Sequence, residues 1–388
     1  MKAFSKDGLI RLESTLKHHV ESGSVPGLVA LVNRGDDTHV FAIGKLALDG
    51  PQPVKRDTIF RIASMTKAVT AAAVMMLIED GTVRLKDRAE NYLPELSNRR
   101  VLKRIDGPID DTVPAERSIT VEDLLDFRLG WGIVFSDKPL PILEAIGDLP
   151  GFGMPNPRWP GGPDDFMRRL GALPLMYQPG ERWLYTLGSN LQGVLIARAS
   201  GMSLEDFFAL RILEPLGMKD TSFGVPKSKL SRLAAGYWFK DGALALFDPP
   251  EGLYSGPPKF PEGDSGLVST VDDYLAFARF LGTGLGKDKK RVLSKASLNA
   301  MKRDHLTPQQ REWGSLILGQ DNGWGYGMAV MGGAAAGAYG WYGGLGTSWI
   351  SDSGKDLIAI ALTQRVFDSP DPPAVHKDFR NAAYQALA

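Results

Sequence analysis

The feature that most constrains this 388-residue chain is an apolar segment, Ala68–Ile78, preceded directly by Ser64-Met65-Thr66-Lys67. Wound as a helix, the segment is apolar on every side, and such a helix is buried inside a protein. Residues three positions apart share one face of a helix, so Lys67 would lie beside Ser64. Packing alone gives no reason to bury a lysine there. The sequence therefore predicts a Ser–Lys pair at the first turn of a central helix.

A Ser–Lys pair suggests a specific chemistry. A serine hydroxyl is a weak nucleophile until a neighbouring base accepts its proton, and lysine is one established base. The same spacing recurs in Ser14-Thr15-Leu16-Lys17, within Leu9–Val20, where apolar residues recur every three or four positions. That pattern is typical of a surface helix, so we expect this second pair to face solvent. Context, rather than the motif, selects Ser64 and Lys67.

Composition excludes other chemistries. The chain has no cysteine, which excludes disulfides, cysteine-ligated zinc and thiol nucleophiles. No Gly-x-Ser-x-Gly elbow, Walker loop or Gly-x-Gly-x-x-Gly motif is present. The five histidines lack the spacing of metal ligands, and we expect none to be catalytic (His18, His19, His39, His305 and His376). We predict no metal and no cofactor, and a base other than histidine.

Charge and hydropathy limit the partners. The 45 Lys and Arg residues balance 45 Asp and Glu residues, which disfavours nucleic acid or an anionic membrane surface as a partner. The N-terminal residues show no apolar signal core, and no stretch approaches the length of a membrane span. We expect a soluble, cytoplasmic protein that acts on a small-molecule ester or amide. The oligomeric state stays open.

Strand-like patterns lie near both ends of the chain. They predict two hairpins, 28–32 with 38–44 and 347–351 with 357–362. Helices are expected near both termini, the last over about 374–388, and no alternation of strands and helices indicates a parallel sheet. We predict an α/β fold of the α+β type, in which an antiparallel sheet is flanked by the N- and C-terminal helices and packed on a mainly helical lobe.

The length exceeds what one simple core usually supports, which favours two lobes in a single domain over residues 1–388. We assign an α/β lobe to roughly residues 1–62 plus 325–388, and a helical lobe to roughly 63–324. Helix-like stretches in the latter are 121–127, 190–199, 204–213 and 272–281. Two Pro/Gly-rich passages, 149–163 and 248–258, are either pocket walls or surface excursions, and their aromatic residues slightly favour pocket walls.

Two further segments could complete a site. Tyr185 lies between a turn and a predicted helix, which makes it a candidate proton shuttle, although a tyrosine in such a place is more often a core or rim residue. The glycine-rich segment Gly340–Thr347 would let a strand approach closely enough to aim a backbone N–H at an oxyanion. The alternative is a glycine-rich bulge.

Taken in order along nearly the whole chain, these segments resemble the serine β-lactamase-like (penicillin-recognising) superfamily, in the branch of class C β-lactamases and family VIII carboxylesterases. The segments that carry the resemblance are Val25-Pro26-Gly27, 60–67, Leu85-Lys86-Asp87, Tyr92-Leu93-Pro94, 177–180 with Tyr185, 215–221, 266–273 and the glycine motif around Tyr342. The implied fold is β-lactamase/transpeptidase-like, with the site between two lobes.

The resemblance also implies roles. Ser64 would be the acylated nucleophile, Lys67 its activating partner, and Tyr185 the second base and proton shuttle. The backbone N–H groups of Ser64 and Leu345 would form the oxyanion hole.

Departures from the family pattern bear on the substrate. Leu187 stands where β-lactamases of this type usually have the asparagine of Tyr-x-Asn, and Tyr342-Gly343-Gly344 replaces Lys-Thr-Gly. A charge-assisted hydrogen bond contributes roughly 1.5–3 kcal/mol, so losing the lysine should weaken anionic substrates by on the order of tenfold or more. Family VIII esterases tend to share this pattern. The expected substrate-binding residues are Trp341, Tyr342, Gly343, Gly344 and Leu187. The segment 124–132 also departs from the family pattern and is expected to reshape the pocket wall.

The sequence therefore predicts a serine hydrolase that cleaves small uncharged carboxylic esters through an acyl-enzyme on Ser64. Three alternatives stay open: a β-lactamase or D-amino-acid peptidase or amidase, an acyltransferase that uses the same site, and an inactive ligand-binding homologue. The natural acyl group and its alcohol or acceptor are not specified by these motifs.

Overall fold

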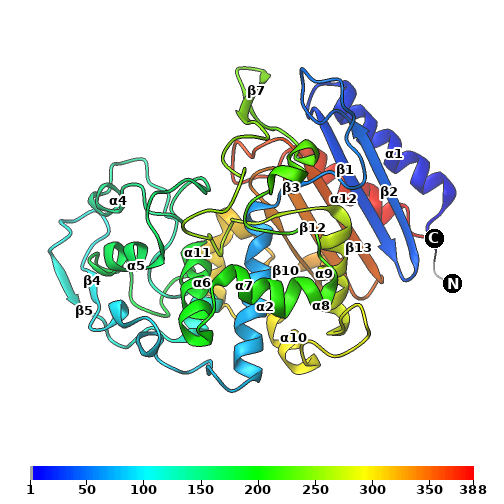
Figure 1. Ribbon diagram of the computed structural model, residues 1–388. Coiled ribbons are helices and arrows are strands. Elements are labelled where there is room, and N and C mark those ends of the chain that lie inside the picture. Colours follow the sequence, from blue (N-terminus) through cyan, green and yellow to red (C-terminus); the bar gives the residue numbers. More distant parts are fainter. Residues whose placement is uncertain (1–2) are drawn as a thin grey trace.

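A seven-stranded antiparallel sheet forms one half of the computed structural model, which describes residues 3–388 (Figure 1). Its strand order is β2-β1-β13-β12-β11-β10-β9, so a hairpin from the start of the chain pairs with strands from its end. The strands are β1 (Gly27–Arg34), β2 (Asp37–Gly44), β9 (Gly323–Trp324), β10 (Ala329–Val330), β11 (Ala338–Gly343), β12 (Thr347–Asp352) and β13 (Leu357–Thr363). The junction is the β1–β13 pair, in which Leu28 lies opposite Thr363.

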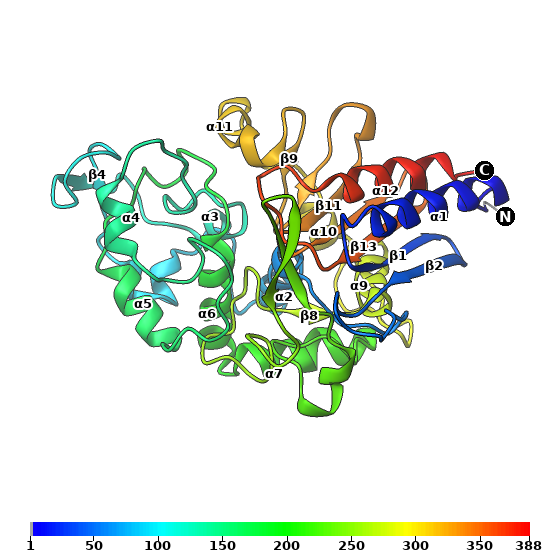
Figure 2. The same ribbon diagram turned by 90° about the horizontal axis from the view of Figure 1, so that it is seen from above.

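The terminal helices cover one face of this sheet. Helix α1 (Lys6–Glu21) and helix α12 (Ala374–Gln385) lie side by side (Figure 2). Helix α1 begins at Ser5, whose hydroxyl accepts a hydrogen bond from the Gly8 N–H at 3.1 Å, as an N-cap does. Helix α9 (Val271–Thr283) packs on the opposite face. With helices on both faces, the central strands β1 and β13 are almost wholly buried.

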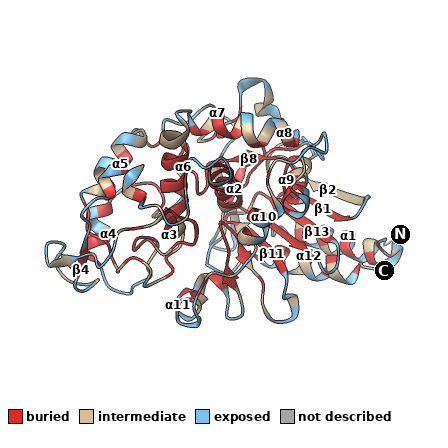
Figure 3. Ribbon diagram, turned by 90° about the horizontal axis from the view of Figure 1, so that it is seen from below, coloured by how far each residue is buried: buried red, intermediate tan, exposed pale blue. Residues whose placement is uncertain are grey.

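Helix α2 (Thr66–Glu79) runs through the middle of the molecule, and its residues from Thr66 to Leu77 are all buried (Figure 3). It contacts α6 (Leu187–Ser200) on one side and α10 (Lys295–Met301) on another. The other helices are α3 (Val121–Leu125), α4 (Pro141–Ile146), α5 (Pro163–Gly171), α7 (Leu204–Phe208), α8 (Glu214–Leu216) and α11 (Pro308–Leu318). Within residues 3–388, no helix is both long and apolar enough to cross a bilayer.

Three two-stranded sheets complete the described part of the chain. They are β3 (Phe60–Arg61) with β8 (Val268–Ser269), β4 (Arg100–Leu102) with β5 (Thr112–Pro114), and β6 (Gly236–Lys240) with β7 (Ala243–Asp248). The β3–β8 pair matters most for the site, because β3 leads directly into Ser64.

The predicted fold class is confirmed, and so are both hairpins and both terminal helices. Strands β9 and β10 were not predicted, because two residues each are too few to show an alternating pattern. The stretch 204–213 is not one regular α-helix: α7 ends at Phe208 and a π-helical turn follows over Ala209–Leu213. Ser14 is exposed and Lys17 pairs with Glu13 at 2.7 Å on the surface of α1, as expected for the second Ser-x-x-Lys match.

The two Pro/Gly-rich passages contact each other. The Arg158 guanidinium, in passage 149–163, donates to the Ser255 carbonyl at 2.7 Å and to the Gly252 carbonyl at 3.2 Å, both in passage 248–258. The second passage is also fixed to β3, because the Arg61 Nε donates to Asp248 Oδ2 at 2.7 Å in a buried ion pair. The segment that precedes Ser64 is thereby tied to both passages.

We expect Asp248→Asn to lower the free energy of unfolding by about 3–5 kcal/mol, because it leaves the buried Arg61 charge without its partner. Urea denaturation followed by circular dichroism measures the change. The control is Asp288→Asn, since Asp288 makes a solvent-exposed pair with Lys290 at 3.3 Å and should leave the transition unmoved. Equal shifts in both variants would contradict a structural role for the buried pair.

Candidate active site

Ser64 lies in a tight turn between β3 and α2. The turn is a single 3₁₀ segment, Ala63–Met65, and Ala63 has a φ of 42°, in the left-handed region that non-glycine residues seldom adopt. Such strain costs on the order of 1–3 kcal/mol and is retained where the surroundings enforce it. Here the Thr347 hydroxyl donates to the Ile62 carbonyl at 3.1 Å. The turn is thus fixed from the side of the sheet.

Lys67 is fully buried in the first turn of α2 and its amine points at Ser64. The Nζ atom lies 2.8 Å from Ser64 Oγ and 2.9 Å from the Asp264 carbonyl oxygen. A carbonyl oxygen only accepts hydrogen bonds, so the amine donates to it. Asp264 Oδ2 is 3.9 Å from the same nitrogen. The predicted Ser–Lys pair is therefore formed, and a carboxylate stands beside it.

Tyr185 meets this pair from the loop before α6. Its ring centroid is 4.6 Å from Lys67 Nζ, and its hydroxyl accepts a hydrogen bond of 2.5 Å from the Trp341 indole N–H. The next residue, Thr186, has a φ of 89° and donates its hydroxyl to Asp264 Oδ2. The structure thus brings together Ser64, Lys67 and Tyr185 from three positions in the sequence.

Aromatic rings surround Tyr185. The centroids of Trp183, Trp324 and Phe127 lie 5.7, 6.1 and 6.1 Å from that of Tyr185. Phe127 belongs to the segment 124–132 that departs from the family pattern, and its φ of 62° directs the chain so that its carbonyl accepts from the Leu184 N–H at 2.9 Å. The unusual segment therefore supports Tyr185 from behind.

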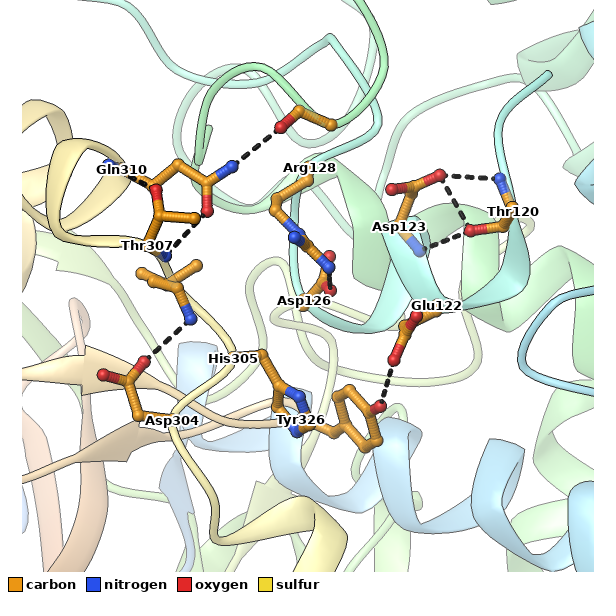
Figure 4. Close-up of polar contacts among 12 residues, drawn as sticks. Thr120, Glu122, Asp123, Asp126, Arg128, Asp304, His305, Thr307, Gln310 and Tyr326 are labelled. Carbon is orange, nitrogen blue, oxygen red and sulfur yellow. Dashed lines mark hydrogen bonds and ion pairs between the residues drawn. The ribbon is translucent and has the colours of Figure 1, made fainter. Parts of the chain in front are cut away.

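Beside Phe127, Asp126 and Arg128 form an ion pair, and Asp126 is fully buried (Figure 4). Burial raises the pKa of Asp126 to about 7, although the Arg128 guanidinium opposes the shift. Nearby, Glu122 of α3 accepts a hydrogen bond of 3.0 Å from Tyr326, whose ring stacks on His305 with centroids 4.1 Å apart (Figure 4). These contacts join α3 to the segment that leads into the sheet.

The glycine-rich turn after β11 packs against the turn that holds Ser64. A Cβ atom at Gly343 would lie 2.2 Å from the Ile62 carbonyl oxygen, so only glycine allows this approach. Within residues 3–388, the Leu345 N–H has no hydrogen-bond acceptor. This free N–H is what an oxyanion hole requires, and the assignment of Ser64 and Leu345 to that role stays a prediction.

Two of the residues expected to bind substrate, Tyr342 and Leu187, make contacts within the protein. Tyr342 points to the face of the sheet covered by α12, where its hydroxyl accepts from Arg380 at 3.2 Å and its ring lies 6.4 Å from His376. Successive side chains of a strand alternate between faces, so Trp341 occupies the position that faces Tyr185. Of the two adjacent aromatic residues expected to bind substrate, Trp341 faces Tyr185 and Tyr342 faces α12, and their roles in substrate binding stay predictions.

Leu187, the other departure, is fully buried at the start of α6. Its Cδ1 would lie 3.0 Å from a Cβ at Gly151, so it packs under the passage 149–163, and its role in substrate binding stays a prediction. The loss of the asparagine thus removes a polar group and adds core contact.

Sequence reasoning named Trp341 as a substrate contact but not as the donor to Tyr185, and it missed the buried acids Asp264 and Glu262. Burial, and then the Asp264 carboxylate, raise the pKa of Glu262 to about 8. Two acidic residues within the otherwise apolar and small Phe260–Val268 could have drawn attention. In the part of the chain that the structure describes, no group of three or more acidic or histidine side chains is placed to hold a metal ion.

Comparison with known proteins identifies the family. The model of the β-lactamase family matches residues 12–383. The protein Rv1367c of Mycobacterium tuberculosis (strain ATCC 25618 / H37Rv) is 35% identical to this chain, over 92% of this chain and 90% of that protein. The chain belongs to the β-lactamase family.

Two relatives whose names describe an activity are similar to this chain along nearly its whole length. Esterase EstB of Burkholderia gladioli is 26% identical, over 96% of this chain and 95% of its own length. Among solved structures, EstCE1, described as a hydrolase with promiscuous acyltransferase activity, superimposes with a TM-score of 0.82 at 22% identity, over 98% of this chain and 99% of that chain. The likeness to EstCE1 shows that the two proteins share one fold.

We expect Trp341→Phe to slow labelling of Ser64 by a fluorophosphonate about tenfold or more, because it keeps the ring but removes the N–H that donates to Tyr185. The rate of labelling, followed by mass spectrometry, measures this. Trp349→Phe is the matched control, since the Trp349 N–H donates to Ser351 Oγ at 2.8 Å away from the site. An unchanged rate in Trp341→Phe would exclude a role for the indole.

Proposed function

We propose that this protein is a serine hydrolase that cleaves small, uncharged carboxylic esters through an acyl-enzyme on Ser64. The observation that carries the proposal is the meeting of Ser64 Oγ and Lys67 Nζ at 2.8 Å beneath the ring of Tyr185. No histidine is needed, because these side chains supply both the nucleophile and the groups that move its proton.

In the proposed reaction, Ser64 Oγ attacks the ester carbonyl carbon while its proton passes to the Lys67–Tyr185 pair. The N–H groups of Ser64 and Leu345 stabilise the negative charge that develops on the carbonyl oxygen. The C–O bond to the alcohol then breaks, and the pair returns the proton to the leaving oxygen. Water attacks the acyl-enzyme by the same route, giving the acid and free Ser64.

The substrate class follows from what faces Tyr185. The Trp341 indole donates a neutral N–H to Tyr185 at 2.5 Å, and the next residue, Tyr342, stands where a β-lactamase of this type usually has a lysine. The site therefore lacks the cation that would pair with a β-lactam or peptide carboxylate, which favours uncharged esters. The relative EstB is an esterase by name, which is consistent with this choice.

A pocket of about 240 Å³ reaches Tyr185 from solvent. Its walls include Phe135, Trp183 and two residues of α11, Trp313 and Leu316. Phe135, Trp313 and Leu316 are large apolar side chains that stay exposed, and their gathering around one pocket is typical of an interaction site. We propose that this pocket receives the apolar part of the ester.

Helix α11 is held over the pocket by two contacts. Thr307 and Gln310 cap its first turn by exchanging hydrogen bonds (Figure 4), and the Gln310 amide donates to the Gly180 carbonyl at 2.7 Å. Further along, the Trp313 ring lies 4.4 Å from the Arg182 guanidinium, which also stacks on Tyr177 at 4.1 Å. The pocket wall is therefore ordered before a ligand binds.

We further propose that the site lies between two lobes, residues 1–62 with 325–388 and residues 63–324. Trp341 and Leu345 come from the first, and Ser64, Lys67 and Tyr185 from the second. Acyl transfer to an alcohol instead of water is a second candidate, supported by the name of the structural relative EstCE1. It needs no change in the site, since an alcohol can attack the same acyl-enzyme.

Turnover of p-nitrophenyl butyrate and nitrocefin, measured side by side, tests the proposal. We expect ester cleavage to dominate and to fall at least about 10³-fold in Ser64→Ala, because the nucleophile is lost. Ser14→Ala, the other Ser-x-x-Lys serine, is the matched control and should keep full activity. Dominant nitrocefin turnover would favour the β-lactamase alternative, and no turnover of either would favour a specialised acceptor or an inactive homologue.

A series of p-nitrophenyl esters from acetate to decanoate tests the pocket. We expect kcat/KM to rise with chain length in the wild type and to lose about tenfold for the longer esters in Trp313→Ala, because about 1–2 kcal/mol of apolar contact is removed. Leu210→Ala, which removes an exposed apolar side chain elsewhere, should leave the series unchanged. Equal losses for acetate and decanoate would mean that Trp313 does not contact the acyl chain.

A further inference from the structure

Two acidic residues that the proposed reaction does not use are buried next to Lys67. Glu262 and Asp264 are 2% and 4% exposed, and Ser265, which is 3% exposed, connects them. The Ser265 hydroxyl oxygen lies 2.8 Å from Asp264 Oδ1 and 3.1 Å from Glu262 Oε2. Two carboxylates this close in the interior repel each other, and neither reduces the free-energy cost of burying the other.

The number of hydrogen atoms decides the charge of this group. A serine hydroxyl carries one hydrogen and can donate only one of the two bonds. In the other bond Ser265 Oγ must accept, and an ionised carboxylate has no hydrogen to donate. Both short contacts therefore form together only when one of the two carboxyl groups is protonated.

The neighbours of each carboxyl group indicate which one holds the proton. Asp264 lies 3.9 Å from the Lys67 amine and also accepts from the Thr186 hydroxyl, and both contacts stabilise a carboxylate. Glu262 forms no ion pair with any cation in residues 3–388. Its Oε1 accepts from the Asn156 N–H at 2.8 Å, as the carbonyl oxygen of a protonated acid can.

We propose that Glu262 is a neutral carboxylic acid near pH 7 that donates a hydrogen bond to Ser265, and that Ser265 donates to an ionised Asp264. The Asp264 carboxylate holds Lys67 as an ammonium ion beside Ser64. Asp264 is thus a positioning residue for Lys67, and Glu262 positions Asp264. The catalytic part of this inference rests on the proposed function, whereas the protonation of Glu262 does not. With Lys67 charged, its amine cannot accept the Ser64 proton, and this proton passes to a Tyr185 phenolate, which becomes a neutral phenol.

The charges around Glu262 agree with this assignment. Facing it are Asp264 on its own segment, Lys67 on α2, and Tyr254, which lies over the Arg61–Asp248 pair. Burial, and then Glu262, raise the pKa of Tyr254 well above its usual value, so this phenol is neutral. Two cations, Lys67 and Arg61, then balance two carboxylates, Asp264 and Asp248. Ionised Glu262 would add a negative charge with no partner.

The same geometry gives the pH dependence. Burial raises the pKa of Glu262 to about 8, so the proton is present below that pH and is lost above it. Once ionised, Glu262 and Asp264 compete for the single Ser265 hydrogen, and Asp264 loses an accepted bond. We therefore expect activity to fall by up to tenfold per pH unit above about pH 8, as loss of one proton requires.

Infrared spectroscopy tests the proton directly, without substrate. We expect a carboxylic-acid C=O band in the wild type at about pH 6 that disappears toward about pH 10 and is missing from Glu262→Gln. Asp126 is a second buried acid, and its band is present in both the wild type and Glu262→Gln, so it cancels when one spectrum is subtracted from the other. The variant Asp126→Asn should keep the Glu262 band. A difference spectrum with no carboxylic-acid band would overturn the assignment, even if the protein cleaves no ester.

The pH profile of p-nitrophenyl butyrate cleavage tests the positioning role. Glu262→Gln, whose amide can donate to Ser265 and accept from Asn156, should keep activity within about threefold at pH 7 and lose the alkaline decline. Asp264→Asn should lower kcat about 10- to 100-fold at all pH values with KM little changed. Asp273→Asn, a buried acid on α9, is the control and should do neither.

An alkaline decline that persists in Glu262→Gln would refute the link between Glu262 and the site. Circular dichroism of each variant shows whether it folds. If Glu262→Gln does not fold, the pH titration of the infrared band in Asp126→Asn, which lacks the other buried acid named above, still decides the protonation state.

Discussion

The burial of the Lys67 amine is the constraint on which the rest of the site depends. A cation in the interior needs acceptors for its N–H groups and an opposite charge nearby. The structure provides a hydroxyl at 2.8 Å, a carbonyl at 2.9 Å and a carboxylate at 3.9 Å, from the turn before α2 and from the segment at Asp264. Each of these groups is held by strained or glycine-rich backbone. The apolar helix α2 therefore fixes the position of the Lys67 amine, and the neighbouring segments supply its hydrogen-bond acceptors and its carboxylate.

Three of the seven non-glycine residues with positive φ in the described part of the chain lie around these groups. The first, Ala63, precedes Ser64. The second, Phe127, packs behind Tyr185, and the third, Thr186, directly follows Tyr185. None is a glycine, so each conformation is maintained by tertiary contacts. The Asp264 carboxylate has two tasks in this arrangement, since it lies beside Lys67 and also accepts from Thr186. One buried acid thereby joins the two halves of the Ser–Lys–Tyr constellation.

Local patterns in the sequence were sufficient for the antiparallel sheet, the terminal helices and the buried Ser–Lys turn, because each depends on residues close together in the chain. The family followed from the order of several such patterns. The position of Trp341 did not follow, because strand register decides which of two adjacent aromatic residues faces Tyr185, and a shift by one residue exchanges the faces. Glu262 and Asp264 were also missed: their burial beside Lys67 results from contacts across about 200 residues of chain, which no local pattern contains.

The pairing of β1 with β13 has a consequence for how such a chain matures. Strands from the first and last parts of the sequence share one sheet. Trp341 lies on β11 and Leu345 in the turn after it, so Ser64 is synthesised long before these neighbours. Contacts between distant parts of a chain form slowly. In a chain that is still being synthesised, Ser64 therefore emerges before Trp341 and Leu345, and the contacts around it are complete only after the C-terminal strands have joined the sheet.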